Sequence, residues 1–73
     1  MYNYRINYEY QNIDLDKEGT GWIDIELKNK LYKEAKDEVK LRYTKYTISQ
    51  LEDAIQQKHW HDMVRITDYK LRG

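Results

Sequence analysis

Residues 2–13 read Tyr-Asn-Tyr-Arg-Ile-Asn-Tyr-Glu-Tyr-Gln-Asn-Ile, an unbroken alternation of large apolar or aromatic residues with polar ones. Side chains two apart lie on the same face of an extended strand, so this period places every large residue on one face. Tyrosine also favours strands. The stretch therefore predicts a long strand with an aromatic face, which the rest of the chain must cover or leave exposed. The members of that face are Tyr2, Tyr4, Ile6, Tyr8 and Tyr10.

The length of 73 residues predicts one domain, residues 1–73, near the size at which a single apolar core is just sufficient. With no cysteine, disulfides and the commonest zinc sites are excluded as sources of stability. Charged residues make up 36% of the chain and the mean hydropathy is −1.09. The 14% aromatic content and the clear periodicities nevertheless favour a folded chain. Oligomerisation or partner binding remains as a further source of stability.

The expected location is the cytoplasm. No stretch has the apolar length needed to span a bilayer, and the start, Met-Tyr-Asn-Tyr-Arg, matches neither a signal peptide nor a lipidation signal. Lysine, asparagine, isoleucine and tyrosine, which have AT-rich codons, are abundant. We therefore expect a low-GC bacterial or phage source, and a small accessory protein of a phage or mobile element that acts on a host protein.

Residues 14–21 form the first break in the pattern and contain the first two glycines. This composition predicts a hairpin loop. Ile23, Ile25 and Leu27 then alternate with polar residues, which predicts a second strand from about Gly21 to Lys28, paired antiparallel with the first. Trp22 would lie on the polar face of this strand, where a tryptophan is either covered or part of a contact surface.

The same loop resembles the first half of an EF-hand calcium loop, in which oxygen ligands recur at alternate residues before a glycine. Asp14, Asp16, Glu18 and Gly19 fit that half. The position of the bidentate carboxylate falls on Ile25, and the flanking segments are predicted strands instead of helices. An acidic, solvated hairpin loop is the preferred interpretation.

Residues 29–46 contain two competing periods. A helical spacing early in this segment predicts a helix over about residues 30–36. Val39, Leu41 and Tyr43 alternate with polar residues, which predicts a strand over about residues 38–44. One continuous helix that extends to Tyr43 is the alternative.

Ser49 and Glu52 have the spacing of a capping box, which predicts a helix over about residues 49–58, with Thr47 and Gln50 as a second register. Val64 and Ile66 alternate with polar residues and predict a last strand over residues 62–71. The predicted fold is α+β: a small antiparallel sheet, made of the long N-terminal hairpin and one or two further strands, packs against one or two helices in the order β-β-(α)-β-α-β.

Catalytic and metal-binding patterns are sparse. His59 and His61 would need an extended backbone to point the same way, and no third ligand is close in the sequence, so no metal site is predicted. A helix-end histidine with Trp60 packed on the core is the preferred interpretation. Ser49 is explained as a cap, and no phosphate-cradling glycine loop is present. We therefore expect no enzyme activity and no cofactor.

The charge is balanced overall but unevenly distributed. Residues 9–26 contain six acids and one base, a net charge of −5, whereas residues 28–46 contain seven bases and three acids, a net charge of +4. Such segments can pair internally or present two faces of opposite sign. A solvated, salt-bridged surface is the simplest interpretation.

Eight tyrosines and two tryptophans favour a small non-catalytic module that binds another protein, as an inhibitor or accessory protein. The alternative for each tyrosine is a ring that is partly buried under a helix. The long first strand also permits pairing across a homodimer. The predicted contact residues lie on the tyrosine-rich sheet and the acidic hairpin: Tyr2, Tyr4, Tyr8, Tyr10, Asp14, Asp16, Glu18 and Trp22.

Binding of single-stranded nucleic acid is the second hypothesis. Residues 40–46 interleave bases with aromatic rings, as proteins that bind single strands do. The pI of about 6.7 and the acidic hairpin argue against a protein dominated by phosphate contacts. The residues of this hypothesis are Lys40, Arg42, Tyr43, Lys45 and Tyr46.

Overall fold

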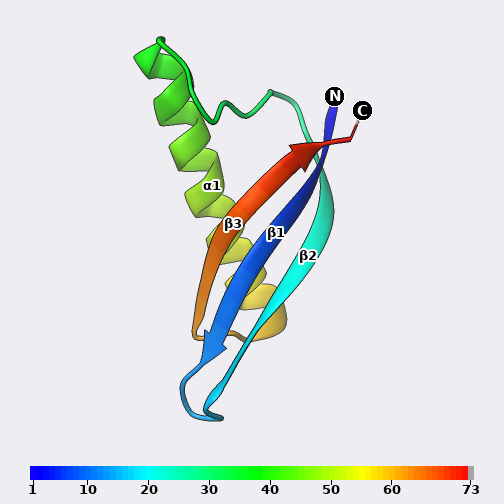
Figure 1. Ribbon diagram of the computed structural model, residues 1–73, viewed down its shortest axis with the longest axis vertical. Coiled ribbons are helices and arrows are strands. Elements are labelled where there is room, and N and C mark those ends of the chain that lie inside the picture. The colour runs from blue at the N-terminus through cyan, green and yellow to red at the C-terminus, as the bar shows by residue number, and fades with distance from the viewer. Residues whose placement is uncertain (73) are drawn as a thin grey trace.

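The computed structural model describes residues 1–72 and is a small α+β fold, as predicted. The elements in chain order are β1 (Tyr2–Asn12), β2 (Lys17–Leu27), α1 (Glu38–His59) and β3 (Met63–Leu71). The strands form one antiparallel sheet in the order β2-β1-β3, and α1 crosses one of its faces (Figure 1). The observed order is therefore β-β-α-β, with one helix and three strands within the described residues.

The alternating pattern of β1 sets the core, as predicted. Tyr4, Ile6 and Tyr8 are buried on the face that α1 covers, and Ile6 is fully buried. The ring of Tyr69 packs edge-on against Tyr4, with the ring centroids 6.1 Å apart. We call the face of the sheet toward α1 the inner face and the opposite face the outer face. Residues packed around the core are Ile23, Ile25, Leu27, Leu31, Tyr43, Ile48, Leu51, Ile66 and Tyr69.

The hairpin loop is shorter than the sequence predicted. The turn spans Ile13 to Asp16, closed by a bond from the Asp16 N–H to the Ile13 carbonyl, and β2 begins at Lys17 instead of Gly21. Asp16 itself adopts a left-handed backbone with φ 49°, which aspartate tolerates better than most residues. The two glycines are therefore not needed for the turn.

Gly19 and Gly21 instead make room for aromatic rings of β1. Gly21 lies opposite Tyr8, and a Cβ at Gly21 would come 2.6 Å from Cζ of that ring. Gly19 lies opposite Tyr10, and a Cβ there would come 2.7 Å from the Tyr10 hydroxyl oxygen. The rings lie across the glycine backbone and replace the side chains that β2 lacks.

The predicted strand at 38–44 and the predicted helix start at Ser49 are wrong, because α1 is one helix of 22 residues. Its N-cap is Asp37, whose carboxylate accepts a hydrogen bond from the Val39 N–H at 2.9 Å. Ser49 is exposed in mid-helix, and Val39 is also exposed. The sheltered side of α1 has helical spacing throughout: Leu41, Thr44, Ile48, Leu51 and Ile55.

Thr44 explains why one continuous helix was not predicted from the sequence. It is a polar residue at a buried position, 5% exposed, so the apolar stripe is interrupted there. Its hydroxyl donates to the Lys40 carbonyl at 2.9 Å and accepts from the Tyr32 N–H at 3.0 Å. These two bonds satisfy the hydroxyl, so its burial in the core does not carry the cost of an unpaired polar group.

The predicted helix over residues 30–36 is not formed. Backbone N–H groups of this segment bond to side chains instead of to carbonyls four residues earlier: Leu31 donates to the Tyr4 hydroxyl at 2.9 Å, and Tyr32 donates to Thr44. Leu31 is 5% exposed and belongs to the core. The segment is therefore an irregular connection that is held down at two adjacent residues.

The predicted last strand is confirmed as β3, with one irregularity. Thr67 has no opposite residue in the register with β1, because Asn7 pairs with Asp68 and Tyr8 pairs with Ile66. This bulge resets the alternation, so that Tyr69 instead of Asp68 reaches the inner face. Trp60, predicted to pack on the core, is 90% exposed and ends α1 in a left-handed conformation with φ 57°.

Candidate functional site

The two edges of the sheet differ in how their backbone groups are covered. On β3, the Ile66 N–H donates to the Glu52 carboxylate of α1 at 2.9 Å. The bulge at Thr67 interrupts the same edge, and α1 makes its main strand contacts with β3. Covering by a helix and a bulge are two ways in which proteins block an edge strand. The β3 edge is therefore protected against pairing with another strand.

The β2 edge has no such protection within residues 1–72. β2 is 11 residues long and pairs with β1 alone. In an antiparallel pair, alternate residues of an edge strand direct their N–H and C=O groups away from the sheet. Figure 1 shows β2 along the side of the sheet farther from the first turns of α1. An extended segment of another chain can therefore add to the sheet at β2 without displacing any described element.

The middle of β2 presents an exposed tryptophan on the outer face. Trp22 is 57% exposed, and the guanidinium of Arg5 lies 4.2 Å from the centre of its ring. Arg5 in turn donates two hydrogen bonds to the Asp24 carboxylate, at 2.9 and 3.0 Å. These bonds raise the pKa of Arg5 and lower the pKa of Asp24 below its ordinary range. We call Arg5, Trp22 and Asp24 the Trp22 cluster.

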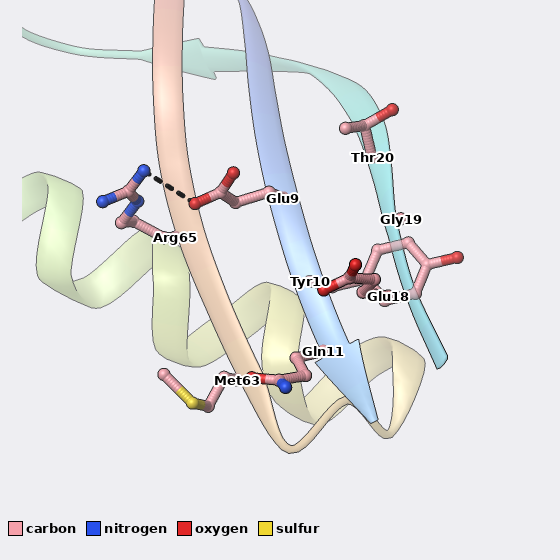
Figure 2. A pocket seen from close by; sticks show the side chains of 8 residues that line it. All are labelled: Glu9, Tyr10, Gln11, Glu18, Gly19, Thr20, Met63 and Arg65. Carbon is pink, nitrogen blue, oxygen red and sulfur yellow. Dashed lines mark ion pairs between the residues drawn. The ribbon is translucent and has the colours of Figure 1, made fainter. Parts of the chain in front are cut away.

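Farther toward the hairpin, the outer face has a shallow hollow of about 520 Å³. Its lining side chains come from all three strands, and Figure 2 shows Glu9 and Arg65 joined by an ion pair across its border. The two side chains approach to 2.7 Å. The Arg65 side chain is 73% exposed and that of Glu9 is 46% exposed, so solvent screens the pair and it contributes little stability. The remaining lining residues are Tyr10, Gln11, Glu18, Gly19, Thr20 and Met63.

The tyrosine face predicted for protein contacts lies mostly inside the molecule. Tyr4 and Tyr8 are buried, and Tyr2, 37% exposed, lies at the start of β1. Tyr10 is half-buried beneath the imidazole of His61, with the ring centres 3.9 Å apart. β1 is hydrogen-bonded to β2 on one edge and to β3 on the other, so neither of its edges is free for the predicted pairing across a homodimer.

The histidines lie where the end of α1 meets the hairpin. The rings of His59 and His61 stack 5.7 Å apart, and His61 Nδ1 is 3.1 Å from the Asn12 side-chain oxygen. Asp62 accepts a hydrogen bond from the Ile13 N–H and donates its own N–H to the Gln11 carbonyl, which ties this connection to the end of β1. In residues 1–72, no three side chains of the metal-ligating kinds form a group that could hold an ion.

The acidic residues predicted for partner contact divide between two places. Asp14 and Asp16 are exposed in the turn beyond β1, whereas Glu18 is exposed on the outer face of β2. Trp22 also lies on that face. The structure therefore places Glu18 and Trp22 on the same face of one strand, with Glu18 beside the turn and Trp22 in the middle of the strand.

The basic and aromatic residues at 40–46 are helical and divide between two sides of α1. Lys40 and Tyr43 lie near Tyr2 and Tyr32. Arg42, Lys45 and Tyr46 are exposed elsewhere on the helix, and Arg42 pairs weakly with Glu38 at 3.9 Å.

Sequence analysis missed the role of Arg5. The strand register places Arg5 opposite Asp24 and would have indicated the pair. Because the hairpin loop was predicted too long, this register could not be derived from the sequence.

No family model, no curated protein and no solved structure matches this chain. Within the part of the chain that is described, no helix has both the length and the apolar character needed to cross a membrane. The geometry of the chain itself is therefore the basis for any functional argument.

Proposed function

We propose that the protein is a non-catalytic binding module that adds an extended segment of another protein to its sheet at β2. The observation that carries the proposal is the difference between the edges: Glu52 caps Ile66 on β3, whereas β2 has no cover among residues 1–72. Strand addition supplies affinity through backbone hydrogen bonds and specificity through alternate side chains.

The Trp22 cluster supports the same surface. Trp22 is the middle residue of β2, and Arg5 and Asp24 hold its ring in place. Tryptophan and arginine are enriched in the few residues that dominate interface energies, and these residues concentrate near the centre of an interface. A partner strand on β2 would place its own side chains beside this ring.

The charge of β2 indicates the chemistry of the partner. Its outer face carries Glu18, Asp24 and Glu26, and Arg5 neutralises the middle one. Opposite charges on neighbouring strands stabilise pairing, and like charges oppose it. We therefore infer a partner segment with lysine or arginine at alternate positions.

A second copy of the chain fits this edge poorly. Two β2 strands paired antiparallel around Trp22 would set Glu18 of each copy opposite Glu26 of the other. These like charges oppose pairing through β2. The proposal is therefore a complex with a different protein, and an inhibitor or accessory protein that occupies a basic segment of its target is one form of it.

A displayed library of random peptides, selected on the immobilised protein, tests this proposal. We expect the selected peptides to carry basic residues at alternate positions. Trp22→Ala should weaken a selected peptide at least about 30-fold, because a central interface residue is worth about 2 kcal/mol or more. Trp60→Ala is the matched control, since Trp60 is also exposed but lies at the end of α1.

Two pairs of charge changes locate the acidic contribution. Glu18→Gln combined with Glu26→Gln should lower the affinity for the selected peptide. Asp14→Asn combined with Asp16→Asn makes the same change in charge at the turn and should not lower it. Loss of binding in the second pair alone would place the partner on the hairpin turn. Equal loss in the two tryptophan variants would contradict binding at β2.

A further inference from the structure

A second hollow lies at the end of the molecule opposite the hairpin turn, where the start of β1, the connection that follows β2 and the start of α1 meet. Its volume is about 400 Å³, within the roughly 300 to 1,000 Å³ of small-ligand pockets. Its lining contains no acidic residue. Six of the lining residues are aromatic or basic: Tyr2, Tyr32, Tyr43, Lys28, Lys30 and Lys40.

The connection that supplies half of these residues is fixed in place. Leu31 is buried and bonded through its N–H to the Tyr4 hydroxyl, and Tyr32 is bonded through its N–H to Thr44. Lys30 directly precedes these two residues in the chain. The backbone of Leu31 and Tyr32 is therefore held by the core before any ligand binds, which reduces the ordering cost of this part of the site.

The three lysines of the hollow are free to bind an anion. None of them takes part in the ion pairs of residues 1–72, although Lys33 and Arg42 nearby do. The amine of Lys40 lies 5.0 Å from the centre of the Tyr32 ring, so one cation is already placed beside one aromatic face.

Two acids at the start of α1 have other partners. Asp37 caps α1, and Glu38 faces Arg42. The acidic turn lies at the opposite end of a molecule 41 Å long (Figure 1). This distance is several times the screening length of about 8 Å at physiological salt, so the turn does not cancel the attraction of the lysines for an anion.

We propose that this hollow binds single-stranded nucleic acid, with a base stacked on a tyrosine ring and the flanking phosphates at Lys28, Lys30 and Lys40. Aromatic side chains stack on bases of any sequence, and a lysine-lined groove follows the backbone. A phosphate alone would leave the three rings without a role. A duplex does not expose its base faces to such a ring. This site is separate from the β2 edge and does not depend on the function proposed for that edge.

Fluorescence anisotropy with a labelled 20-nucleotide oligothymidylate at low salt tests the proposal. We expect saturable binding with a slope of log K against log[salt] near −2, because about 0.7 counterions are released per phosphate contact on a single strand. Replacement of Lys28, Lys30 and Lys40 by glutamine should abolish it. Lys17, Lys58 and Lys70 replaced by glutamine are the matched control, since these exposed residues lie outside the hollow and the charge change is the same.

The ring contribution is tested with Tyr2→Leu, which removes an aromatic face at a partly exposed position. We expect about five- to 150-fold weaker binding, the loss found when one stacking residue is removed. Far-ultraviolet circular dichroism checks that each variant is folded. The proposal would be overturned if the unaltered protein did not bind the oligonucleotide, or if it bound a duplex or a free mononucleotide equally well. It would also be overturned if the two lysine variants lost the same affinity, or if Tyr2→Leu kept the affinity of the unaltered protein.

Discussion

The guanidinium of Arg5 on β1 and the carboxylate of Asp24 on β2 form two parallel hydrogen bonds on the outer face, at 2.9 and 3.0 Å. The two residues are directly opposite in the register of the hairpin. Because the same guanidinium lies over Trp22, the pair also holds the ring that we place at the centre of the partner contact.

This pair makes the folded state sensitive to acid. The hydrogen bonds lower the pKa of Asp24 in the folded protein, so the folded state binds fewer protons than the unfolded chain near the ordinary pKa of aspartate. The contribution is present above about pH 4 and is lost as the pH falls through the lowered pKa. Asp24→Asn should therefore be less stable than the unaltered protein at pH 7, and the difference should shrink as the pH falls through the lowered pKa of Asp24.

Urea unfolding at pH 7 and at a series of lower pH values measures this difference. Asp53→Asn, which removes the same charge from an exposed position on α1, should show no comparable dependence. Asp68, whose pKa the Lys33 amine lowers, keeps some acid sensitivity in either variant. If the difference in the free energy of unfolding between Asp24→Asn and the unaltered protein stays constant with pH, the pair does not form in solution.

The close approach of the Tyr8 ring to Gly21 predicts that Gly21→Ala destabilises the protein. An added Cβ would lie 2.6 Å from the ring, and Tyr8 is buried, so the ring has little room to move. We expect a loss of about 1–3 kcal/mol in the free energy of unfolding, the usual cost of overpacking. Thr20→Ala, at the exposed position beside it, should change stability by less than about 0.5 kcal/mol.

Chemical denaturation of the two variants measures these values. Gly19→Ala should lie between them, because Tyr10 is half-buried and its ring can shift outward. A Gly21→Ala variant as stable as the unaltered protein would mean that the ring of Tyr8 does not lie over β2.

The Tyr4 hydroxyl predicts a second effect on stability. It accepts a hydrogen bond from the N–H of Leu31, and both residues are buried. Tyr4→Phe leaves that N–H without its partner, which should cost about 1–3 kcal/mol in the free energy of unfolding. Tyr46→Phe, on a ring that is 65% exposed, is the matched control. Equal stability of the two variants in urea unfolding would contradict the role given to this bond.

The start of α1 predicts that Asp37, and not Ser49, caps the helix. Asp37→Ala removes the acceptor for the Val39 N–H and should cost about 1 kcal/mol. Ser49→Ala should leave stability unchanged or raise it slightly, because alanine is the better residue inside a helix. The thermal midpoint followed by circular dichroism compares the two. If Ser49→Ala lowers the thermal midpoint more than Asp37→Ala does, the helix begins at Ser49 instead.

β1 was predictable from the sequence because its inner residues alternate without a break, and β3 because Val64 and Ile66 alternate before the bulge. β1 and β3 lie close to their predicted limits, and Trp22 was correctly placed on the polar face of β2. The start of β2 was missed, since Gly19 and Gly21 are typical turn residues and nothing local shows that two rings of another strand lie over them.

The helix was less predictable because its buried face includes a threonine. Thr44 is acceptable there because its hydroxyl donates to the Lys40 carbonyl and accepts from the N–H of Tyr32, 12 residues earlier. The contact with Tyr32 is a tertiary contact, which cannot be predicted from the spacing of residues along the chain. The same contact brings Tyr32 and Lys40 together, so the second hollow was hidden for the same reason.

Amide hydrogen exchange along β2 and β3, with and without a selected peptide, tests the claim that β2 is the binding edge most directly. In the free protein, we predict fast exchange at alternate amides of β2 and slow exchange at Ile66, which Glu52 caps. The peptide should slow those amides of β2 and leave β3 unchanged. If the β2 amides are already protected in the free protein, or if the peptide slows amides elsewhere and leaves β2 unchanged, binding by strand addition at β2 is wrong.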